Sequence, residues 1–569
     1  MNILGIKYGG HDTSAALMIN GKLIAACAQE RYTHDKHSRK FPIDAINDCF
    51  KIGGISLKDI DEIAYVNDIK TFLKEIYLKP AFKSYKRFKF LIKDFNKFLR
   101  LYNTEKIVRE KLNYSGKINF YRHHLCHIAS AYYPSGFKDA LCLSIDGMAE
   151  HETGMIAEGR SGKIKILSAK NFYPDSLGLL YSAITDFLGW KNHCDEGIIM
   201  GLAPFGNPEA NIPNSNRNYI SVFNEILEEK GEFEFKVNLD LVDYYSARNK
   251  WVTEKFKKIF GSKRNYDEPI TENHKNIAAA LQLRLENVVL NQLKNAKQKF
   301  GFDKLCLSGG VALNCSMNGK IEQSNLFKEI YVQPASADDG CAIGACYLAN
   351  FTQSEKPFKE KKMFNSYLGS RFSKDDIKEE LKNSKLKFSE PENIYKETSK
   401  LLNQGKIVAW FQDAAEFGPR ALGNRSILCK PSPASMKDYL NKQVKFREDF
   451  RPFAPAVLDK YQNEYFNIKQ DSYHMLIAST VKKEKKNIIP AVVHVDGTCR
   501  VQTVKKEINE KFYMLLEEFN LLTKIPVILN TSFNIKGQPI VNTPAEAIST
   551  FKNTKIDVLI IGDFVLKKN

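Results

Sequence analysis

The chain has 569 residues, of which 84 are Lys or Arg and 66 are Asp or Glu, so its formal net charge at pH 7 is +18. At roughly 150 residues per domain, this length predicts two to four domains and excludes a single small module. Hydrophobic residues make up 43% of the chain and charged residues 26%, which is typical of a globular protein that folds without a partner.

The chain carries no sequence signal for a membrane or for an oxidising compartment. Apolar runs such as residues 407–411 are far shorter than the roughly 20 residues of a membrane span. The N-terminus runs directly into a strand-like pattern and lacks the parts of a signal peptide. The 11 cysteines are scattered without a CxxC pair. We therefore expect a cytoplasmic protein with no membrane span.

Two similar strand units occur early in the chain. Residues 2–8 and 15–28 give three apolar runs, and Asn20-Gly21 between the last two predicts a tight hairpin. A comparable arrangement returns at residues 140–145, followed by Asp146-Gly147 and runs at 154–158 and 163–167. The repetition predicts a duplicated α/β architecture.

Residues 70–111 form a basic segment, with thirteen Lys or Arg against four acids. Aromatic residues are interleaved at helical spacing, and Pro80 interrupts the pattern. One interpretation is an amphipathic helical insertion whose aromatic side chains pack on the body while its lysines face water. The other is a patch for an acidic polymer or a membrane surface. We favour the first.

A candidate metal site starts from His123 and His127. These residues stand four apart, one turn on a helix, so both imidazoles can meet one cation, whereas His124 points elsewhere. Asp146 follows a strand, and Asp338 lies in a loop of small residues, so both can add oxygen ligands. Imidazole with carboxylate suits iron, manganese or zinc better than calcium. The alternative is a pair of buried structural histidines.

A glycine loop at residues 308–314 follows the strand-like run 304–307. Gly309 and Gly310 permit close backbone approach to a nucleotide, and the following Val311 to Asn314 offer amide donors at a helix start. The loop is neither a Walker A sequence nor a GxGxxG fingerprint. The alternative is a plain strand-to-helix turn.

A polar, Lys-rich segment at residues 352–362 predicts a linker to a second α/β domain. That domain carries basic residues in loops shaped by Gly and Pro. Such arginines can hold an oxyanion with two parallel hydrogen bonds, and their clustering is unfavourable without an anion. A dianionic phosphate substrate is the natural inference, although Lys442 and Arg447 also fit a solvated helix face. The basic residues of these loops and their surroundings are Arg420, Lys442, Lys445, Arg447, Arg451 and Arg500.

These motifs together resemble the NodU/CmcH carbamoyltransferases, which include enzymes that carbamoylate antibiotic and nodulation-factor sugars. The resemblance runs from Ile3 to about Leu566, in the order and spacing of that family. The segments that carry it are residues 10–16, 30–33, 36–37, 41–42, 123–130, 200–206, 308–314, 417–428 and 530–534.

The resemblance implies an actin-like ATPase domain at residues 1–355, with the helical basic insertion at about 70–111, followed by a YrdC-like α/β domain at 363–569. It also implies that ATP and carbamoyl phosphate form a carbamoyl adenylate, whose carbamoyl group passes to an acceptor hydroxyl. The implied metal is Fe(II), and Mg(II) can accompany ATP. The implied sites are His123, His127, Asp146 and Asp338 for the metal, and Arg420, Lys445, Arg451, Arg500 and Ser532 for carbamoyl phosphate. The glycine loop supplies the candidate nucleotide-binding residues Gly309, Gly310, Val311 and Asn314.

The acceptor hydroxyl needs a base, and His11 beside Asp12 is the best candidate, because an imidazole can take a proton near neutral pH. The alternative for His11 is a hydrogen bond that orders its loop. The chain departs from the family pattern at Ile198, where a lysine is usual. Lys36, in a separate matching motif, and Lys191 are candidate substitutes.

The expected acceptor is a small molecule or sugar, such as a natural product or a surface glycan. A second hypothesis is carbamoyl-type modification of a macromolecule such as tRNA or protein, with the +18 charge contacting it. A third is a nucleotide-gated binding protein without transfer chemistry, which would not need a separate carbamoyl-phosphate site. We expect no nucleic-acid partner, and the resemblance is consistent with a homodimer.

Overall fold

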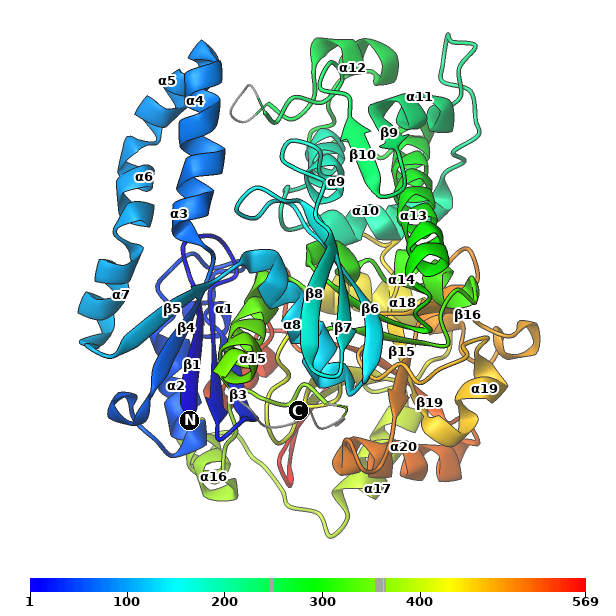
Figure 1. Cartoon of the computed structure of the whole chain (residues 1–569). Helices are drawn as coiled ribbons and strands as arrows, with labels where there is room; N and C mark the ends of the chain where they lie inside the picture. The colour runs from blue at the N-terminus through cyan, green and yellow to red at the C-terminus, as the bar shows by residue number, and fades with distance from the viewer. Residues whose placement is uncertain (246–249, 354–361, 363–364, 569) are drawn as a thin grey trace. The chain divides into compact units, whose positions relative to one another are not determined.

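The computed structural model describes residues 1–245, 250–353, 362 and 365–568 (Figure 1). These residues divide into two compact units. The first unit contains Met1–Leu23 and Ile55–Lys362, and the second contains Ile24–Gly54 and Met363–Asn569. The expected domain boundary between 355 and 363, and most of the expected linker, fall outside the described residues. The division at 355/363 therefore stays a prediction.

The first unit begins with a five-stranded sheet in the order β3-β2-β1-β4-β5. β1 is antiparallel to β2 and parallel to β4, which is parallel to β5. Asn20 and Gly21 both have positive φ, as the predicted hairpin turn between β2 and β3 requires. The strands are β1 (Asn2–Lys7), β2 (Ser14–Ile19), β3 (Lys22–Ala28), β4 (Glu62–Val66) and β5 (Lys117–Tyr121).

A second five-stranded sheet in the same unit has the order β12-β11-β6-β7-β8. Its strands in chain order take the same places as those of the first sheet, with an antiparallel meander followed by two parallel strands. The same strand arrangement therefore occurs twice in this unit, so the predicted duplication is confirmed. The strands are β6 (Asp139–Ile145), β7 (Gly154–Arg160), β8 (Lys163–Ser168), β11 (Lys304–Ser308) and β12 (Glu329–Val332).

Two helices join the sheets of this unit. α15 (Cys341–Gln353) packs on β1, β2 and β4, whereas α8 (His123–Ser135) packs on β6 and β11, and the two helices pack against each other. Ends of α8, β6 and α15 therefore meet at one place. The unit also contains α9 (Leu177–Phe187), α10 (Glu196–Leu202), α11 (Tyr219–Ile226), α12 (Glu254–Phe260), α13 (Glu272–Phe300), α14 (Cys315–Gln323) and the hairpin of β9 (Leu227–Lys230) and β10 (Glu234–Val237).

The basic segment is helical, as predicted, and we call residues 69–112 the helical arm. Pro80 lies in the first turn of α4 and does not break the helix, whereas Ser84 has an extended backbone and separates α4 from α5. Its parts are α3 (Ile69–Phe72), a wider helical turn η2 (Leu73–Leu78), α4 (Lys79–Lys83), α5 (Tyr85–Lys93), α6 (Phe95–Tyr102) and α7 (Thr104–Leu112).

The second unit is built on a seven-stranded mixed sheet in the order β18-β15-β19-β14-β13-β20-β21. Val408 and Trp410 face a core with α17 and α20, whereas Ala409 and Phe411 face the opposite core, as the alternation of a buried strand demands. The strands are β13 (Val408–Phe411), β14 (Arg425–Cys429), β15 (Ala454–Leu458), β18 (Gln502–Val504), β19 (Val527–Ser532), β20 (Val558–Ile561) and β21 (Phe564–Lys567).

Helices cover both faces of this sheet, so the expected second α/β domain is present. They are α16 (Lys374–Asn383), α17 (Ile394–Asn403), α18 (Ser435–Leu440), α19 (Gln462–Tyr465), α20 (Glu510–Thr523) and α21 (Pro544–Lys552), with a small hairpin of β16 (Ala478–Thr480) and β17 (Thr498–Arg500).

An N-terminal segment with α1 (Glu30–Thr33) and α2 (Ile43–Gly53) belongs to the second unit. Buried Arg31 donates to the carbonyl oxygens of Gly418, at 2.7 Å, and Ile540, at 3.3 Å. The Asp48 carboxylate accepts from the hydroxyls of Tyr32 and Ser370. Nothing in the local sequence pattern of residues 24–54 indicated this membership.

Within the part of the chain that the structure describes, no helix is both long enough and apolar enough to cross a membrane.

Candidate metal and anion sites

The four residues of the predicted metal site come together in the first unit. His123 and His127 lie on the first two turns of α8, Asp146 directly follows β6, and Asp338 opens the short turn before α15. One ligand atom from each lies within 4.8 Å of the others. The meeting of α8, β6 and α15 thus joins residues that are more than 200 positions apart.

The two imidazoles face the same pair of carboxylates. His123 Nε2 lies 3.3 Å from Asp146 Oδ2 and 3.2 Å from Asp338 Oδ1. His127 Nε2 lies 3.4 Å and 3.7 Å from the same two oxygens. Both histidines and Asp338 are buried, and Asp146 is partly buried. The result is an N₂O₂ donor set pointing at one centre.

Neighbouring groups fix the orientation of these side chains. The Nδ1–H of His123 donates to Asn67 Oδ1 at 2.9 Å, which leaves the lone pair of Nε2 for a cation. Asp146 Oδ1 accepts from the Gly310 amide at 3.1 Å. Lys7, buried at the end of β1, lies 3.0 Å from Asp338 Oδ2. Each carboxylate therefore has one oxygen engaged and the other turned to the histidines.

The charges in this cluster are strongly coupled. Burial opposes the charged form of His123, but interactions with Cys341, Asp338 and Asp146 outweigh it and raise the pKa to about 10. Burial likewise opposes ionisation of Asp338, yet Lys7 and His123 hold its pKa well below the usual value. Two carboxylates in repulsion need positive charge between them, and a divalent cation would supply it in place of imidazole protons. The donor set therefore fits such a cation.

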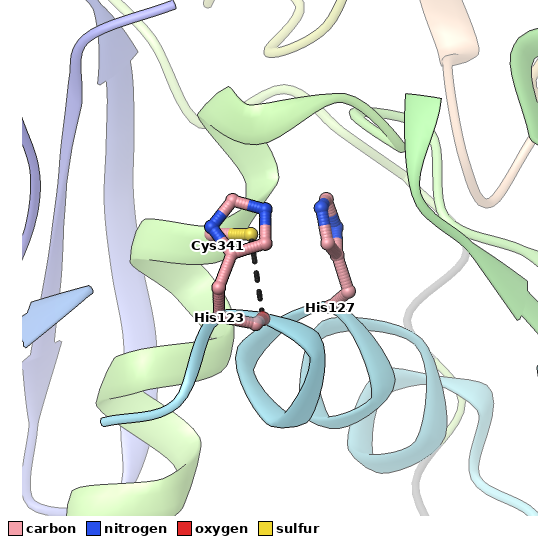
Figure 2. A group of neighbouring side chains, drawn as sticks. All are labelled: His123, His127 and Cys341. Carbon is pink, nitrogen blue, oxygen red and sulfur yellow. Dashed lines mark hydrogen bonds between the residues drawn. The ribbon is translucent and has the colours of Figure 1, made fainter. Parts of the chain in front are cut away.

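A buried thiol adjoins this centre. Cys341 is the first residue of α15, and its sulfur lies 4.0 Å from the His123 carbonyl oxygen (Figure 2). Together with His123 and His127 it forms a second group of ligand atoms within 4.8 Å. His124 stays out of the centre, because its nitrogens lie 2.8 Å from Ser144 Oγ and 3.1 Å from the Glu152 carbonyl oxygen. Its pKa is lowered to about 3, mainly by burial.

The predicted base lies on the loop after β1. His11 Nδ1 is 2.9 Å from Asp12 Oδ2, so Nδ1 carries the donated proton and Nε2 keeps a lone pair. Burial acts to lower the His11 pKa, but the hydrogen bond and charge of Asp12 outweigh it and raise the pKa above 6.5. Ser14 Oγ donates to the Asp339 carbonyl at 2.8 Å, which ties this loop to the loop of Asp338.

The glycine loop supports the metal cluster through its backbone. Gly309 has φ +87°, and a Cβ there would lie 2.2 Å from the Ile145 carbonyl oxygen, so only glycine fits beside the end of β6. Gly310 donates its amide to Asp146. Asn314 caps α14 by accepting from the Met317 amide at 2.9 Å. Val311 lies in the short turn between them. The nucleotide role of these residues remains a prediction.

The second unit holds a cationic cluster around Lys445, at the end of a helical turn formed by Asn441–Lys445. Its ammonium donates to Ser532 Oγ at 3.3 Å, to Asn534 Oδ1 at 2.9 Å and to the Asn534 carbonyl at 3.1 Å. Burial, followed by the charges of Arg447, Lys36 and Arg451, holds the pKa of Lys445 well below its usual value.

Three arginines extend this group. Burial and the charges of Arg451 and Arg500 hold the pKa of Arg447 well below its usual value. Arg451 has one acidic neighbour, Glu448, at 3.6 Å. The buried Arg500 Nε has no hydrogen-bond partner among the described residues. We call Lys36, Lys445, Arg447, Arg451 and Arg500 the cationic cluster.

Arg420 is half-buried on a loop that buried Glu416 organises. One oxygen of Glu416 accepts from the amides of Leu422 and Asn424 at 2.7 Å, and from that of Arg425 at 3.2 Å. Arg425 is fully buried, and its guanidinium donates to four backbone carbonyls. The Arg425 side chain therefore stabilises the surrounding loops and is not available to bind a ligand.

Sequence reasoning missed several members of both groups. The sequence left Arg447 open between the anion site and a solvated helix face, and in the structure it belongs to the cationic cluster. Lys36, a candidate substitute for the lysine that is missing at Ile198, lies in the second unit, where its charge acts on Lys445. Lys7 was not considered, although a lysine inside an apolar strand run is itself a signal, because a buried ammonium needs a partner.

Comparison with known proteins identifies the family of this chain. The family model described as "Carbamoyltransferase N-terminus" matches residues 2–347, and "Carbamoyltransferase C-terminus" matches residues 399–568. The chain therefore belongs to the carbamoyltransferase family, and the resemblance seen in its motifs is confirmed. It is an enzyme of the transferase class.

Its relatives include both nodulation proteins and uncharacterized proteins. It is 37% identical to the uncharacterized protein sll1178 of Synechocystis, over 100% of this chain and 97% of that one. It is 35% identical to nodulation protein NolNO of Sinorhizobium fredii, over 98% and 79% respectively. Among solved structures, component A of the (R)-2-hydroxyglutaryl-CoA dehydratase of Acidaminococcus fermentans is 12% identical with a TM-score of 0.33, covering 63% of this chain and 100% of that one.

Proposed function

We propose that the protein is an ATP-dependent O-carbamoyltransferase that uses carbamoyl phosphate, through a carbamoyl adenylate, to carbamoylate a hydroxyl of a small molecule or sugar. In the first half-reaction, carbamoyl phosphate, ATP and one water give carbamoyl adenylate, phosphate and pyrophosphate. In the second, the hydroxyl oxygen bonds to the carbamoyl carbon, the bond from that carbon to the AMP oxygen breaks, and the hydroxyl proton leaves.

The observation that carries the proposal is the cationic cluster of the second unit. Lys445 is buried, Arg447 and Arg451 are half-buried, and their positive charges repel one another, which is unfavourable until an anion binds. Arg500 offers a buried Nε–H that has no hydrogen-bond partner in the part of the chain that the structure describes. Carbamoyl phosphate is a small dianion, and Arg420 and Ser532 are the further candidates to hold it. Binding such an anion would offset the repulsion inside the cluster.

The histidine and aspartate cluster of the first unit would hold a divalent cation, with Fe(II) the metal that the family resemblance implies. A cation bound there supplies Lewis-acid polarisation of a carbonyl or phosphoryl oxygen. Hydrogen bonds within the chain fix the ligand side chains in position, since Asn67 orients His123 and Gly310 orients Asp146.

His11 is the residue that we assign to the acceptor proton. Asp12 keeps the proton of the imidazole on Nδ1, so Nε2 can accept one from a hydroxyl. The carboxylate also stabilises the imidazolium that results, which is the physical reason for its raised pKa.

Incubation with carbamoyl phosphate radiolabelled in the carbamoyl group, ATP and a panel of hydroxyl compounds tests the proposal. We expect label in an acid-stable product, with AMP and pyrophosphate formed, and no transfer when ATP is omitted. Transfer that proceeds equally well without ATP, or ATP use that yields ADP in place of AMP, would contradict the adenylate route.

A further inference from the structure

The helical arm exposes large apolar side chains to solvent. Of the seventeen large hydrophobic residues that are exposed among the described residues, eight lie between Leu78 and Tyr102. Phe82 is 89% exposed, Tyr85 72% and Tyr102 71%. The preferred sequence interpretation, in which the aromatic residues of this segment pack on the body, is therefore wrong for a large part of them.

The exposed residues of α5 and α6 form one stripe. Their spacing alternates between three and four positions, so they share one helix face. The face that packs inward carries other residues, among them Arg87, Phe98 and Leu101, which are half-buried or buried. The stripe consists of Tyr85, Phe88, Ile92, Phe95, Leu99 and Tyr102.

A basic stripe runs beside the apolar one. Between residues 79 and 103 there are eight Lys or Arg and one acid. Four of the cations directly follow an apolar stripe residue in sequence, which places them about 100° further round the helix. These four are Lys86, Lys89, Lys93 and Arg100.

The arm is held by contacts inside its own unit. Arg87 donates to the carbonyl oxygens of Tyr245, at 3.1 Å, and Ile76, at 2.8 Å. Its guanidinium also lies 4.8 Å from the centre of the Tyr245 ring. Figure 1 shows α3 and α4 running alongside α5, α6 and α7 as a helical pair. The apolar stripe of α5 and α6 is therefore carried by helices that are held in place by contacts with the rest of their unit.

We propose that the helical arm docks on an anionic lipid surface, with the apolar stripe entering the boundary between headgroups and acyl chains. Helices that lie in a membrane interface combine an aromatic and aliphatic face with flanking lysines and arginines. Their cations are attracted by the negative surface potential of anionic lipids. The arm has both features, and the charge complementarity is with lipid phosphate.

Two other occupants fit the arm less well. A second copy of this chain would bring a like-charged stripe, so its approach would be opposed. The phosphates of a nucleic acid could pair with the lysines, and its bases could stack on Phe82 or Phe88. Exposed aliphatic side chains such as Ile92 and Leu99, however, would gain no favourable contact with a nucleic acid. A lipid surface uses the aromatic, aliphatic and basic groups together.

Co-sedimentation of the full chain with vesicles tests this proposal. We expect the protein to bind vesicles of phosphatidylcholine mixed with phosphatidylglycerol, and to bind pure phosphatidylcholine vesicles weakly. Binding should fall as salt is raised, because the basic stripe is exposed and screened. Equal binding to both vesicle types, or none to either, would overturn the proposal.

Paired variants separate the two stripes. Phe88→Ser with Phe95→Ser should lower the partition coefficient about tenfold or more, since each removes an aromatic side chain from the interface. Lys89→Glu with Lys93→Glu should lower it at least about tenfold, because each basic residue near the surface contributes about fivefold. The matched controls are Tyr266→Ser, an exposed aromatic outside the arm, and Lys378→Glu with Lys382→Glu, which repeats the charge change at the same spacing on α16.

The controls should bind as the parent does, and all variants should keep the parent's circular dichroism and melting temperature. If the two controls lose vesicle binding as strongly as the paired variants of the arm do, the arm is not the docking surface. If Phe88→Ser with Phe95→Ser instead converts a dimer to a monomer in sedimentation velocity, the stripe is a protein interface and the proposal is wrong. RNA that competes equally with vesicles for the parent would also overturn it.

Discussion

At the scale of single residues, the metal cluster depends on groups that the sequence alone could and could not reveal. The spacing of His123 and His127 predicted a shared cation, and the structure brings Asp146 and Asp338 to them. The role of Asn67 could not be inferred, because it depends on where β4 ends relative to α8. Lys7 gave the signal that a buried ammonium needs a partner, but which partner it meets depends on where β1 ends relative to α15. A ligand pair on one helix is a local pattern, whereas its supporting groups are set by tertiary packing.

The first prediction concerns the metal ligands. His127→Ala should remove one of two nitrogen donors, and we expect bound iron or zinc to fall to a small fraction of the parent's content in elemental analysis. Cys341→Ser is the matched comparison, since the hydroxyl preserves shape but not the soft donor. We expect it to retain metal, because carboxylates already complete the set; metal loss in Cys341→Ser would make the thiolate a ligand instead.

The second prediction concerns the pH dependence of transfer. A base must be unprotonated, so transfer should rise with pH through the His11 pKa, and its midpoint should lie above 6.5 because Asp12 raises that pKa. Asp12→Asn removes the charge, so the midpoint should move to lower pH. The measurement is the rate of transfer from supplied carbamoyl adenylate as a function of pH, for the parent and for Asp12→Asn.

His11→Gln tests the same assignment without a pH change. The variant should make adenylate normally but deliver product about 10² to 10⁴ times more slowly, since it keeps a hydrogen-bonding side chain without useful basicity. Product formation within a few-fold of the parent would show that His11 only orders its loop.

At the scale of elements, the glycine loop shows how a weak sequence signal acquires a structural meaning. The sequence left open a nucleotide loop or a plain turn. In the structure, Gly309 allows the chain after β11 to lie against the end of β6, and the Gly310 amide then donates to Asp146.

The helical arm shows the opposite case. Its helices were predictable from periodicity, but periodicity cannot tell which face packs, because apolar residues occur on both faces of α5 and α6.

The third prediction concerns this loop. Gly309→Ala places a Cβ 2.2 Å from the Ile145 carbonyl at a φ of +87°. We expect a loss of about 1–3 kcal/mol in the free energy of unfolding, and weaker metal binding because Asp146 lies next to Ile145. Gly301→Ala is the control: Gly301 also has positive φ, but nothing lies within 4 Å of its Cβ position. If Gly301→Ala weakens metal binding equally, the effect is general destabilisation.

At the scale of the whole molecule, the two units hold different groups of candidate site residues, the histidine and aspartate cluster in the first and the cationic cluster in the second. The duplicated strand units and the presence of a second α/β domain were predictable, because each strand run and its turn residues are local in sequence. The membership of residues 24–54 was not, since it rests on Arg31 reaching carbonyls more than 300 residues away. The same holds for Lys36, whose charge acts on Lys445. The cationic cluster is thus assembled from both ends of the chain.

The last prediction tests this division of labour. Arg451→Ala removes one cation from the cluster, and losing a partner of a bound dianion costs about 2–5 kcal/mol, so formation of carbamoyl adenylate from carbamoyl phosphate should fall steeply. Transfer from chemically supplied adenylate should stay near the parent's rate, because that step needs no carbamoyl phosphate.

His127→Ala in the first unit is the counterpart, and it should lose transfer even when the adenylate is supplied. Phosphate, as a probe for the anion site, should raise the melting temperature of the parent and of His127→Ala but not that of Arg451→Ala, since only the last lacks part of the site. If Arg451→Ala fails equally with supplied adenylate while phosphate still stabilises it, Arg451 serves transfer rather than anion binding. The cationic cluster would then have to be assigned to the adenylate itself.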